Sequence, residues 1–141
     1  MSDAAEQRRL DELLAAIPYI GFLGMSAELV DGGMIARLPF RDALVGNTQL
    51  PALHGGVLGA FMEMTALMWL AHSQPSTRQP RTIDITLEYL RPGRARTTFA
   101  RADIRKIGRR IANVQVEAWQ EARQIPVAAL RGHFRLGDGG G

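Results

Sequence analysis

The sequence contains no cysteine, which excludes disulfides, thiolate metal sites and a cysteine nucleophile. Lysine occurs once, at Lys106, and aromatic residues make up only 6% of the chain. The most apolar run, residues 57–71, is interrupted by Glu63. A membrane-spanning helix needs about 20 apolar residues, so this run is too short. We therefore expect no membrane segment and a soluble, cytoplasmic protein.

The composition that is present suits one globular domain. The chain has 141 residues, of which 46% are hydrophobic and 22% are charged, enough to bury a core of its own. The N-terminal segment MSDAAEQRRLDELL is polar and lacks the apolar core of a signal peptide. We expect an N-terminal helix within residues 1–17, a single domain over residues 18–136, and a disordered glycine-rich tail over residues 137–141.

Hydrophobic periodicity predicts one long helix and about six strands. Residues 3–16 carry leucines at helical spacing, and Pro18 ends that helix. Residues 55 to about 72 are strong helix formers with apolar side chains nearly all round, so something must wrap this helix. An antiparallel sheet curled around it is the economical solution, which makes the fold class α+β. The predicted strands are residues 26–30, 34–38, 82–90, 95–107, 110–120 and 125–136.

The segment over residues 82–90 has the clearest strand pattern. Its side chains alternate along nine residues, which predicts that every second one lies on the same face. The residues on that apolar face are Ile83, Ile85, Leu87 and Tyr89.

Positive charge is concentrated in one stretch of the chain. Of the 17 basic residues, eight lie between Arg91 and Arg110, and only Asp103 offsets them there. This clustering favours an anionic ligand on one face, although a solvated strand face in an arginine-rich chain has the same composition. The stretch contains only Phe99 as an aromatic residue, so it lacks a stacking platform for bases. We expect no nucleic-acid partner.

The start of the long helix, His54-Gly55-Gly56, is a candidate binding element. Glycines let a ligand approach the backbone closely, and the first N–H groups of a helix lack intrahelical partners. They lie at the positive end of the helix dipole and can bind a carbonyl oxygen that becomes an oxyanion. The alternative is an ordinary helix start, with His54 as a polar residue beside it.

Glu63 is the strongest candidate for chemistry. It lies among apolar residues of the long helix, and no Lys or Arg occurs between Gly55 and Gln74. A buried carboxylate is costly unless it is hydrogen bonded or paired, and such groups are concentrated at functional sites. The sequence therefore predicts a general base, with a structural carboxylate partnered from elsewhere as the alternative.

The spacing of these two features predicts a dimer. Gly55 and Glu63 are eight residues apart, which at 1.5 Å per residue is about 12 Å along one helix. They can act on one carbonyl group only if the helix packs antiparallel against its copy in a two-fold homodimer. Each of two sites then combines the helix start of one subunit with the carboxylate of the other.

At these residues the chain resembles the PaaI-type acyl-CoA thioesterases of the hotdog superfamily, from about Pro18 to Leu136. The matching motifs are Leu53-His54-Gly55-Gly56, the acid at position 63, the segment TIDITLEYLRP at residues 82–92, and KIGRR at residues 106–110. The resemblance implies a hotdog fold, with about six antiparallel strands wrapped around a central helix. It also implies hydrolysis of an acyl-CoA by a homodimer or homotetramer, with no cofactor because CoA is part of the substrate.

The resemblance also implies residue roles. Gly55 is similar to the residue whose backbone N–H polarises the thioester carbonyl group, with Asn47 and His54 helping to position it. Glu63 matches the acid that activates water or attacks the carbonyl directly, and Thr82 matches the hydroxyl that orients that water. Most relatives carry Asp rather than Glu on the helix. The implied substrate and CoA contacts are Gly56, Ile83, Asp84, Arg91, Gly108, Arg109 and Arg110.

Two other hotdog functions are alternatives to hydrolysis. A non-catalytic acyl-CoA-binding or sensing hotdog domain would bind the ligand without turnover. A hotdog hydratase or dehydratase would need a histidine and an acid paired across the interface, with a different spacing between glycine and acid. The three histidines are scattered along the chain and form no ligand set, so we expect no metal. Aromatic, short-chain and medium-chain acyl groups are all compatible with the sequence.

Overall fold

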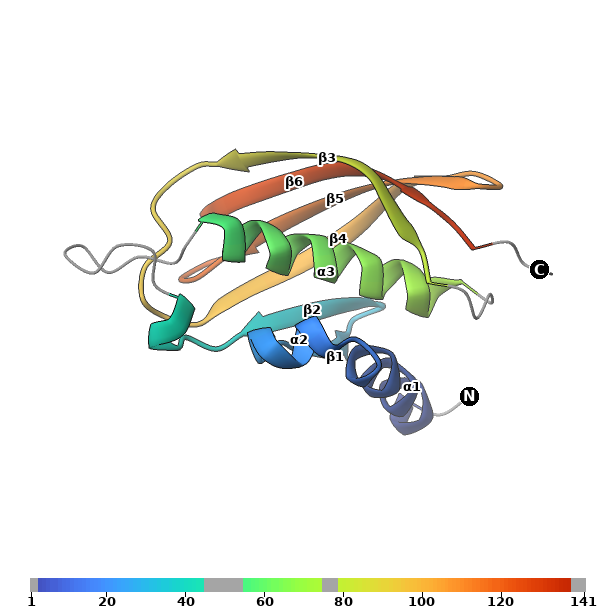
Figure 1. Ribbon diagram of the computed structural model, residues 1–141, viewed down its shortest axis with the longest axis horizontal. Helices are drawn as coiled ribbons and strands as arrows, with labels where there is room; N and C mark the ends of the chain where they lie inside the picture. Colours follow the sequence, from blue (N-terminus) through green and yellow to red (C-terminus); the bar gives the residue numbers. More distant parts are fainter. Residues whose placement is uncertain (1–2, 45–54, 75–78, 138–141) are drawn as a thin grey trace.

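The computed structural model describes residues 3–44, 55–74 and 79–137. Over these ranges the chain has an α+β fold in which a long helix lies against one face of a six-stranded sheet (Figure 1). The helices are α1 (Asp3–Ala15), α2 (Pro18–Leu23), a 3₁₀ helix (Asp42–Leu44) and α3 (Gly55–Ser73). The strands are β1 (Ser26–Val30), β2 (Gly33–Leu38), β3 (Arg81–Tyr89), β4 (Thr98–Ile107), β5 (Ile111–Trp119) and β6 (Pro126–Arg135).

The strands pair in the order β1-β2-β4-β5-β6-β3, and every neighbouring pair is antiparallel. Although β3 precedes β4 in the chain, it lies beside β6, so β1 and β3 form the two edges of the sheet. The predicted hotdog fold, with about six antiparallel strands around a central helix, is confirmed.

The core lies between α3 and the concave face of the sheet. From α3, large apolar side chains such as Phe61 and Met62 are fully buried. The facing positions of the sheet are rich in alanine, and these small side chains let the helix approach the strands closely. The buried alanines of the sheet are Ala27, Ala36, Ala100, Ala102, Ala112, Ala118 and Ala128.

The helix α3 is covered unequally around its circumference. Gly56 is exposed, and Ala60, Glu63 and Leu67 are only partly buried. These residues are spaced by three or four and therefore form one stripe along the helix. Within one chain, the sheet covers the opposite side of α3 and leaves this stripe partly exposed. Across the described ranges, none of the helices combines the length and apolar character needed to span a lipid bilayer.

Pro18 has a second role that the sequence did not reveal. It ends the N-terminal helix as predicted, and it is also the first residue of the short helix α2. Proline suits this position because the N–H group that it lacks would have no intrahelical partner there. The helix α2 then ends at Gly24, whose φ of 74° lies in the left-handed region that glycine adopts without strain.

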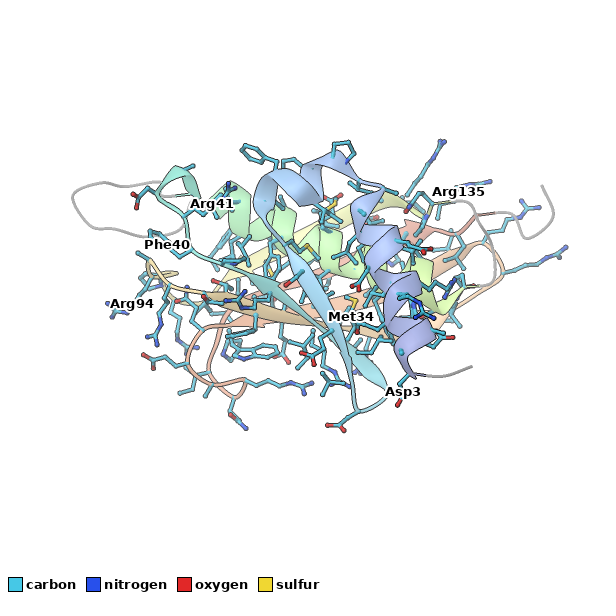
Figure 2. The ribbon with its side chains drawn as sticks, turned by 90° about the horizontal axis from the view of Figure 1, so that it is seen from below. Asp3, Met34, Phe40, Arg41, Arg94 and Arg135 are labelled. Carbon is cyan, nitrogen blue, oxygen red and sulfur yellow. The ribbon has the colours of Figure 1, made fainter. Side chains whose placement is uncertain are left out.

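The helix α1 lies beside β1 and covers that edge of the sheet (Figure 2). The side-chain amide of Gln7 donates to the carbonyl oxygen of Ala27 at 3.0 Å and accepts from the N–H of Leu29 at 3.0 Å. Gln7 therefore occupies the backbone groups that another strand would use for pairing.

The helix α1 also holds the end of α3. Arg9 donates to the carbonyl oxygen of His72 at 2.6 Å and to that of Gln74 at 3.1 Å, which satisfies groups that a helix end leaves unpaired. Burial lowers the pKa of His72, and the nearby Arg9 lowers it further, although Glu6 raises it. The neutral form of the His72 ring is therefore favoured, and its Nε2 lies 3.1 Å from Glu6. The contacts of the His72 ring with Arg9 and Glu6 thus link α1 to the end of α3.

Candidate active site

Glu63 and Thr82 are brought together across the face of the sheet. The Thr82 hydroxyl donates a hydrogen bond of 2.6 Å to Oε2 of Glu63, although the residues are 19 apart in the chain. Both side chains are partly buried. Hydrogen bonds to a carboxylate are short and about twice as strong as neutral ones, so this contact fixes the Glu63 carboxylate on the strand β3.

A β-bulge makes this contact possible. The pairing register of β3 with β6 shifts between Thr82 and Asp84, so Ile83 is an extra residue. Thr82 lies opposite the buried Phe134, on the same face of the sheet as Ile85. The prediction that Ile83 shares the apolar face of Ile85 is wrong, because an inserted residue breaks the period of two. The bulge aims Thr82 toward α3 and leaves Ile83 52% exposed.

The surroundings of Glu63 differ from those expected. The side chain lies on the partly exposed stripe of α3 and is not fully buried. Among the described residues it takes part in no ion pair. The hydroxyl of Thr82 holds Oε2, and none of the described residues contributes a partner for Oε1, which can accept from a ligand or water.

The start of α3 is held by β3 as well. The Tyr89 hydroxyl donates to the carbonyl oxygen of Gly55 at 2.7 Å. A Cβ added at Gly59 would lie 2.8 Å from the end of the Leu87 side chain, so the absence of a side chain at Gly59 leaves room for Leu87 of β3. Gly55 is partly buried and Gly56 is exposed. The sequence did not single out the Tyr89 hydroxyl, because its only signal was the apolar alternation of the strand.

Two predicted residues, Asn47 and His54, lie outside the described residues, and their roles remain predictions. Gly55 and Glu63 are both described and belong to one uninterrupted helix. Their separation of about 12 Å along the helix axis therefore applies within one chain. A carbonyl group bound at Gly55 is out of reach of Glu63 of the same chain.

Asp84 lies on the opposite face of the sheet from Thr82. Its carboxylate is 2.9 Å from Nδ1 of His133 on β6, and both side chains are more than half exposed. The bulge at Ile83 separates Asp84 from Thr82 in this way. Within one chain, Asp84 is therefore not beside the carboxylate of Glu63.

The remaining predicted CoA contacts fall into two groups at opposite ends of β3. Arg91 follows the end of β3, where its guanidinium donates to the carbonyl oxygen of Pro126. Together with Arg94 and Arg96 it lines a cavity of about 190 Å³. Residues 108–110 form the turn between β4 and β5, and the N–H of Leu136 donates to the carbonyl oxygen of Arg110 there.

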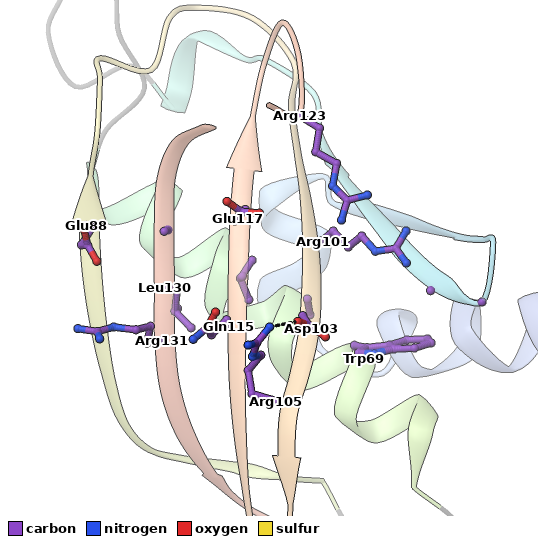
Figure 3. Close-up of a pocket in the computed structure, with 15 residues that line it drawn as sticks. Trp69, Glu88, Arg101, Asp103, Arg105, Gln115, Glu117, Arg123, Leu130 and Arg131 are labelled. Atoms are coloured by element: carbon purple, nitrogen blue, oxygen red, sulfur yellow. Dashed lines mark hydrogen bonds and ion pairs between the residues drawn. The ribbon is translucent and has the colours of Figure 1, made fainter. Parts of the chain in front are cut away.

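The arginine-rich stretch does not form one basic face. Arg96 pairs with Glu121 at 3.0 Å, and Arg105 pairs with Asp103 at 2.9 Å. Arg94 lies at one end of the molecule, whereas β4 carries Arg105 along the sheet (Figures 2 and 3). These residues are divided between two places, because Arg91, Arg94 and Arg96 follow β3 and line the 190 Å³ cavity, whereas Arg101 and Arg105 belong to β4.

The convex face of the sheet carries a separate cavity of about 580 Å³ (Figure 3). Its lining mixes both signs of charge, including Arg101, Glu117 and Arg131, with Trp69 of α3 at one side. Gly55, Glu63 and Thr82 are not part of this lining. Glu63 and Thr82 instead meet on the side of the sheet that faces α3. Within the described ranges no group of three metal-ligating side chains occurs.

Comparison with known proteins shows which family and fold the chain shares. A family model described as the thioesterase superfamily matches residues 50–127. The chain is 27% identical over 136 residues to the medium/long-chain acyl-CoA thioesterase YigI of Escherichia coli K12, with 86% of each chain covered. A crystal structure of a protein from Chromobacterium violaceum is 40% identical, covers 96% of both chains and has a TM-score of 0.75. The E. coli PaaI protein of the phenylacetic acid degradation operon is 20% identical, with a TM-score of 0.79 and coverage of 98% and 99%, and shares the fold.

Proposed function

The chain belongs to the thioesterase superfamily and has the hotdog fold of PaaI-type members, and from this premise we propose that it hydrolyses acyl-CoA thioesters to a free acid and CoA. The observation that carries the proposal is the 2.6 Å hydrogen bond between Thr82 and Glu63. It holds a carboxylate on a partly exposed stripe of the central helix, where the described residues supply neither a countercharge nor a partner for the second carboxylate oxygen.

The reaction that this carboxylate supports is general-base hydrolysis. Glu63 takes a proton from a water molecule, and the water oxygen forms a bond to the thioester carbonyl carbon. The carbonyl oxygen becomes an oxyanion, which the N–H groups at the start of α3 bind. When the C–S bond breaks, the CoA thiolate leaves and receives the proton from Glu63. The Thr82 hydroxyl fixes the carboxylate and offers its own oxygen to the same water molecule.

The distance between Gly55 and Glu63 requires two chains for each site. In a two-fold dimer with antiparallel α3 helices, the start of one helix lies beside the middle of the other. The partly exposed stripe of α3, which contains Gly56 and Glu63, supports this arrangement because it is the side that the sheet leaves uncovered. We extend the proposal to a homodimer with two composite sites, and to pairing of such dimers as a homotetramer.

The two edges of the sheet support the same dimer. The edge at β1 is occupied by the side-chain amide of Gln7. The edge strand β3 and the residue after it expose large apolar side chains, with Ile83, Tyr89 and Leu90 each about half exposed. Large exposed apolar residues on an open edge mark a contact surface, so β3 is the edge expected to meet the second copy.

The composite site also accounts for the two groups of predicted CoA contacts. Arg91 lies at the end of β3 near the start of α3, because Tyr89 contacts Gly55 there. Residues 108–110 lie at the other end, since Arg110 is linked to Leu136 beyond the end of β6. In the proposed dimer, Arg91 of one subunit and Arg110 of the other flank one site. If the chain does not form this dimer, the two groups of predicted CoA contacts do not belong to one site.

The experiment that tests the function is a thiol-release assay with a panel of acyl-CoAs. The panel spans short, medium, long and aromatic acyl groups, and includes the medium and long chains named for the YigI relative. Glu63→Gln keeps the shape of the side chain but cannot accept the proton, so kcat is expected to fall about 10²- to 10⁴-fold. The matched control is Glu12→Gln, at an exposed position of α1, which is expected to keep the wild-type kcat.

Two results would contradict the proposal. One is the absence of thiol release from every acyl-CoA by the folded wild-type protein. The other is a Glu63→Gln variant with the kcat of the wild type, which would leave Glu63 without a role in the chemistry. Binding of acyl-CoA without turnover would instead indicate a sensing domain.

A further inference from the structure

Tyr89 contacts the first turn of α3 in two ways. Its hydroxyl donates to the carbonyl oxygen of Gly55 at 2.7 Å. Its side chain also packs against two glycines of the helix, because an added Cβ would be 3.6 Å from the ring at Gly55 and 3.3 Å from the hydroxyl oxygen at Gly59. The backbone of Tyr89 is fixed opposite Ala128 in the sheet. The hydroxyl therefore ties the start of α3 to a strand whose position is set by the ladder.

This hydrogen bond acts on a particular peptide group. The carbonyl of Gly55 and the N–H of Gly56 belong to one planar peptide unit. A donor on the carbonyl oxygen therefore restrains the direction of the N–H and polarises it. Two successive glycines have the greatest backbone freedom of any pair. The first turn of a helix that begins with them therefore needs a contact from outside the helix to fix its backbone.

Tyr89 has surroundings that differ from those of a core tyrosine. Its side chain is 53% exposed, so the hydroxyl is not placed there merely to satisfy a buried polar group. It lies on β3, the edge strand proposed to meet the second copy. The hydroxyl thus combines an exposed position with a contact to Gly55, the residue whose own N–H the family resemblance assigns to the thioester carbonyl group.

We propose that Tyr89 is a positioning residue, whose hydroxyl holds Gly55 and the first turn of α3 in the orientation in which the start of α3 binds the oxyanion. The inference rests on the proposed function. Tyr89 acts through the peptide and does not itself contact the reacting atoms. It belongs to the subunit that supplies the oxyanion-binding turn, whereas Glu63 and Thr82 of that site come from the second copy.

Tyr89→Phe is the direct test, because it removes the hydroxyl and keeps the ring. Oxyanion binding is common to every thioester, so the loss in kcat is expected to be about tenfold and equal across the acyl-CoA panel. KM is expected to stay within about twofold of the wild type, since the acyl and CoA contacts are intact. The matched control is Tyr19→Phe on α2, at a side chain that is 42% exposed, with wild-type kcat expected.

A second variant separates positioning from packing. Tyr89→Leu also removes the ring from Gly55 and Gly59, so it is expected to lower the melting temperature and to lose at least as much kcat as Tyr89→Phe. All rates are measured well below the melting temperatures and divided by the folded fraction from circular dichroism. A purely structural Tyr89 would lower the melting temperature of Tyr89→Phe and leave its corrected kcat unchanged, which overturns the inference.

The variants test the role of Tyr89 separately from the proposed thioesterase activity. If Glu63→Gln loses turnover while Tyr89→Phe keeps it, the inference about Tyr89 fails and the proposed function stands. If the loss in Tyr89→Phe varies strongly with the acyl chain, Tyr89 contacts the acyl group, and the positioning role is again overturned. If the wild type cleaves no thioester, the proposed function fails first.

Discussion

Thr82→Val is the variant that addresses the central contact of the site most directly. Valine has nearly the same shape as threonine and the same preference for strands, so the bulge at Ile83 and the pairing with Phe134 should persist. What disappears is the donor to Oε2 of Glu63 at 2.6 Å. The carboxylate then has no described partner to hold it in one rotamer.

The size of the effect follows from the nature of the bond. A hydrogen bond to a charged group contributes about 1.5–3 kcal/mol when it is shielded from solvent. Both side chains here are only partly buried, so water replaces part of that contribution, and we expect a loss of about 1 kcal/mol in the free energy of unfolding. The effect on catalysis should be larger, because a misplaced base slows the reaction by up to about 10²-fold. We expect kcat to fall about ten- to a hundredfold with little change in KM.

The assay is thiol release from the best acyl-CoA of the panel, together with thermal unfolding of each variant. Thr82→Ser retains the hydroxyl and is expected to keep most of the activity. Thr86→Val is the matched control, because Thr86 is an exposed position of the same strand, paired with Arg131 on β6. A Thr82→Val variant with the kcat of Thr86→Val would contradict this prediction, since the hydroxyl would then have no part in holding the base.

Two further predictions concern assembly and pH. Each site needs the start of one α3 and Glu63 of another, so dilution that dissociates the dimer should also lower the activity per chain. Sedimentation velocity measures the dimer, and thiol release measures the activity. A monomer that retains activity would exclude the composite site. Burial and Arg9 lower the pKa of His72 from 6.5 in the folded chain. As the pH falls through about 6.5, the unfolded chain therefore binds more protons at this ring than the folded chain, and the free energy of unfolding decreases. His72→Gln should remove this part of the pH dependence of the melting temperature, and an unchanged slope in acid would show that other groups cause it.

Several features were predictable because they depend on local spacing. The helix α3 was expected from its composition, and Glu63 was noticed because no cation lies within three or four residues of it on the helix. The separation of Gly55 and Glu63 follows from the helical rise alone. The strand bounds came out within a few residues for the same reason, since alternation and turn residues are properties of short segments.

Other features depend on how distant segments meet. Strict alternation placed Ile83 on the face of Ile85, and only the pairing with β6 reveals the bulge that turns Thr82 toward Glu63 instead. Thr82 entered the prediction through the family resemblance, because a threonine at the start of a strand has no distinguishing local signal.

Composition and the fixed rise and period of helices and strands are enough to predict the class of fold, the apolar central helix and the identity of its single acid. The contacts of that acid, the uncovered side of α3 and the distribution of the arginines of residues 91–110 are visible only in the folded chain. These depend on strand order, on one inserted residue in β3 and on the approach of Tyr89 to Gly55. Such contacts join residues far apart in the chain, and their geometry is set by packing that no local pattern encodes.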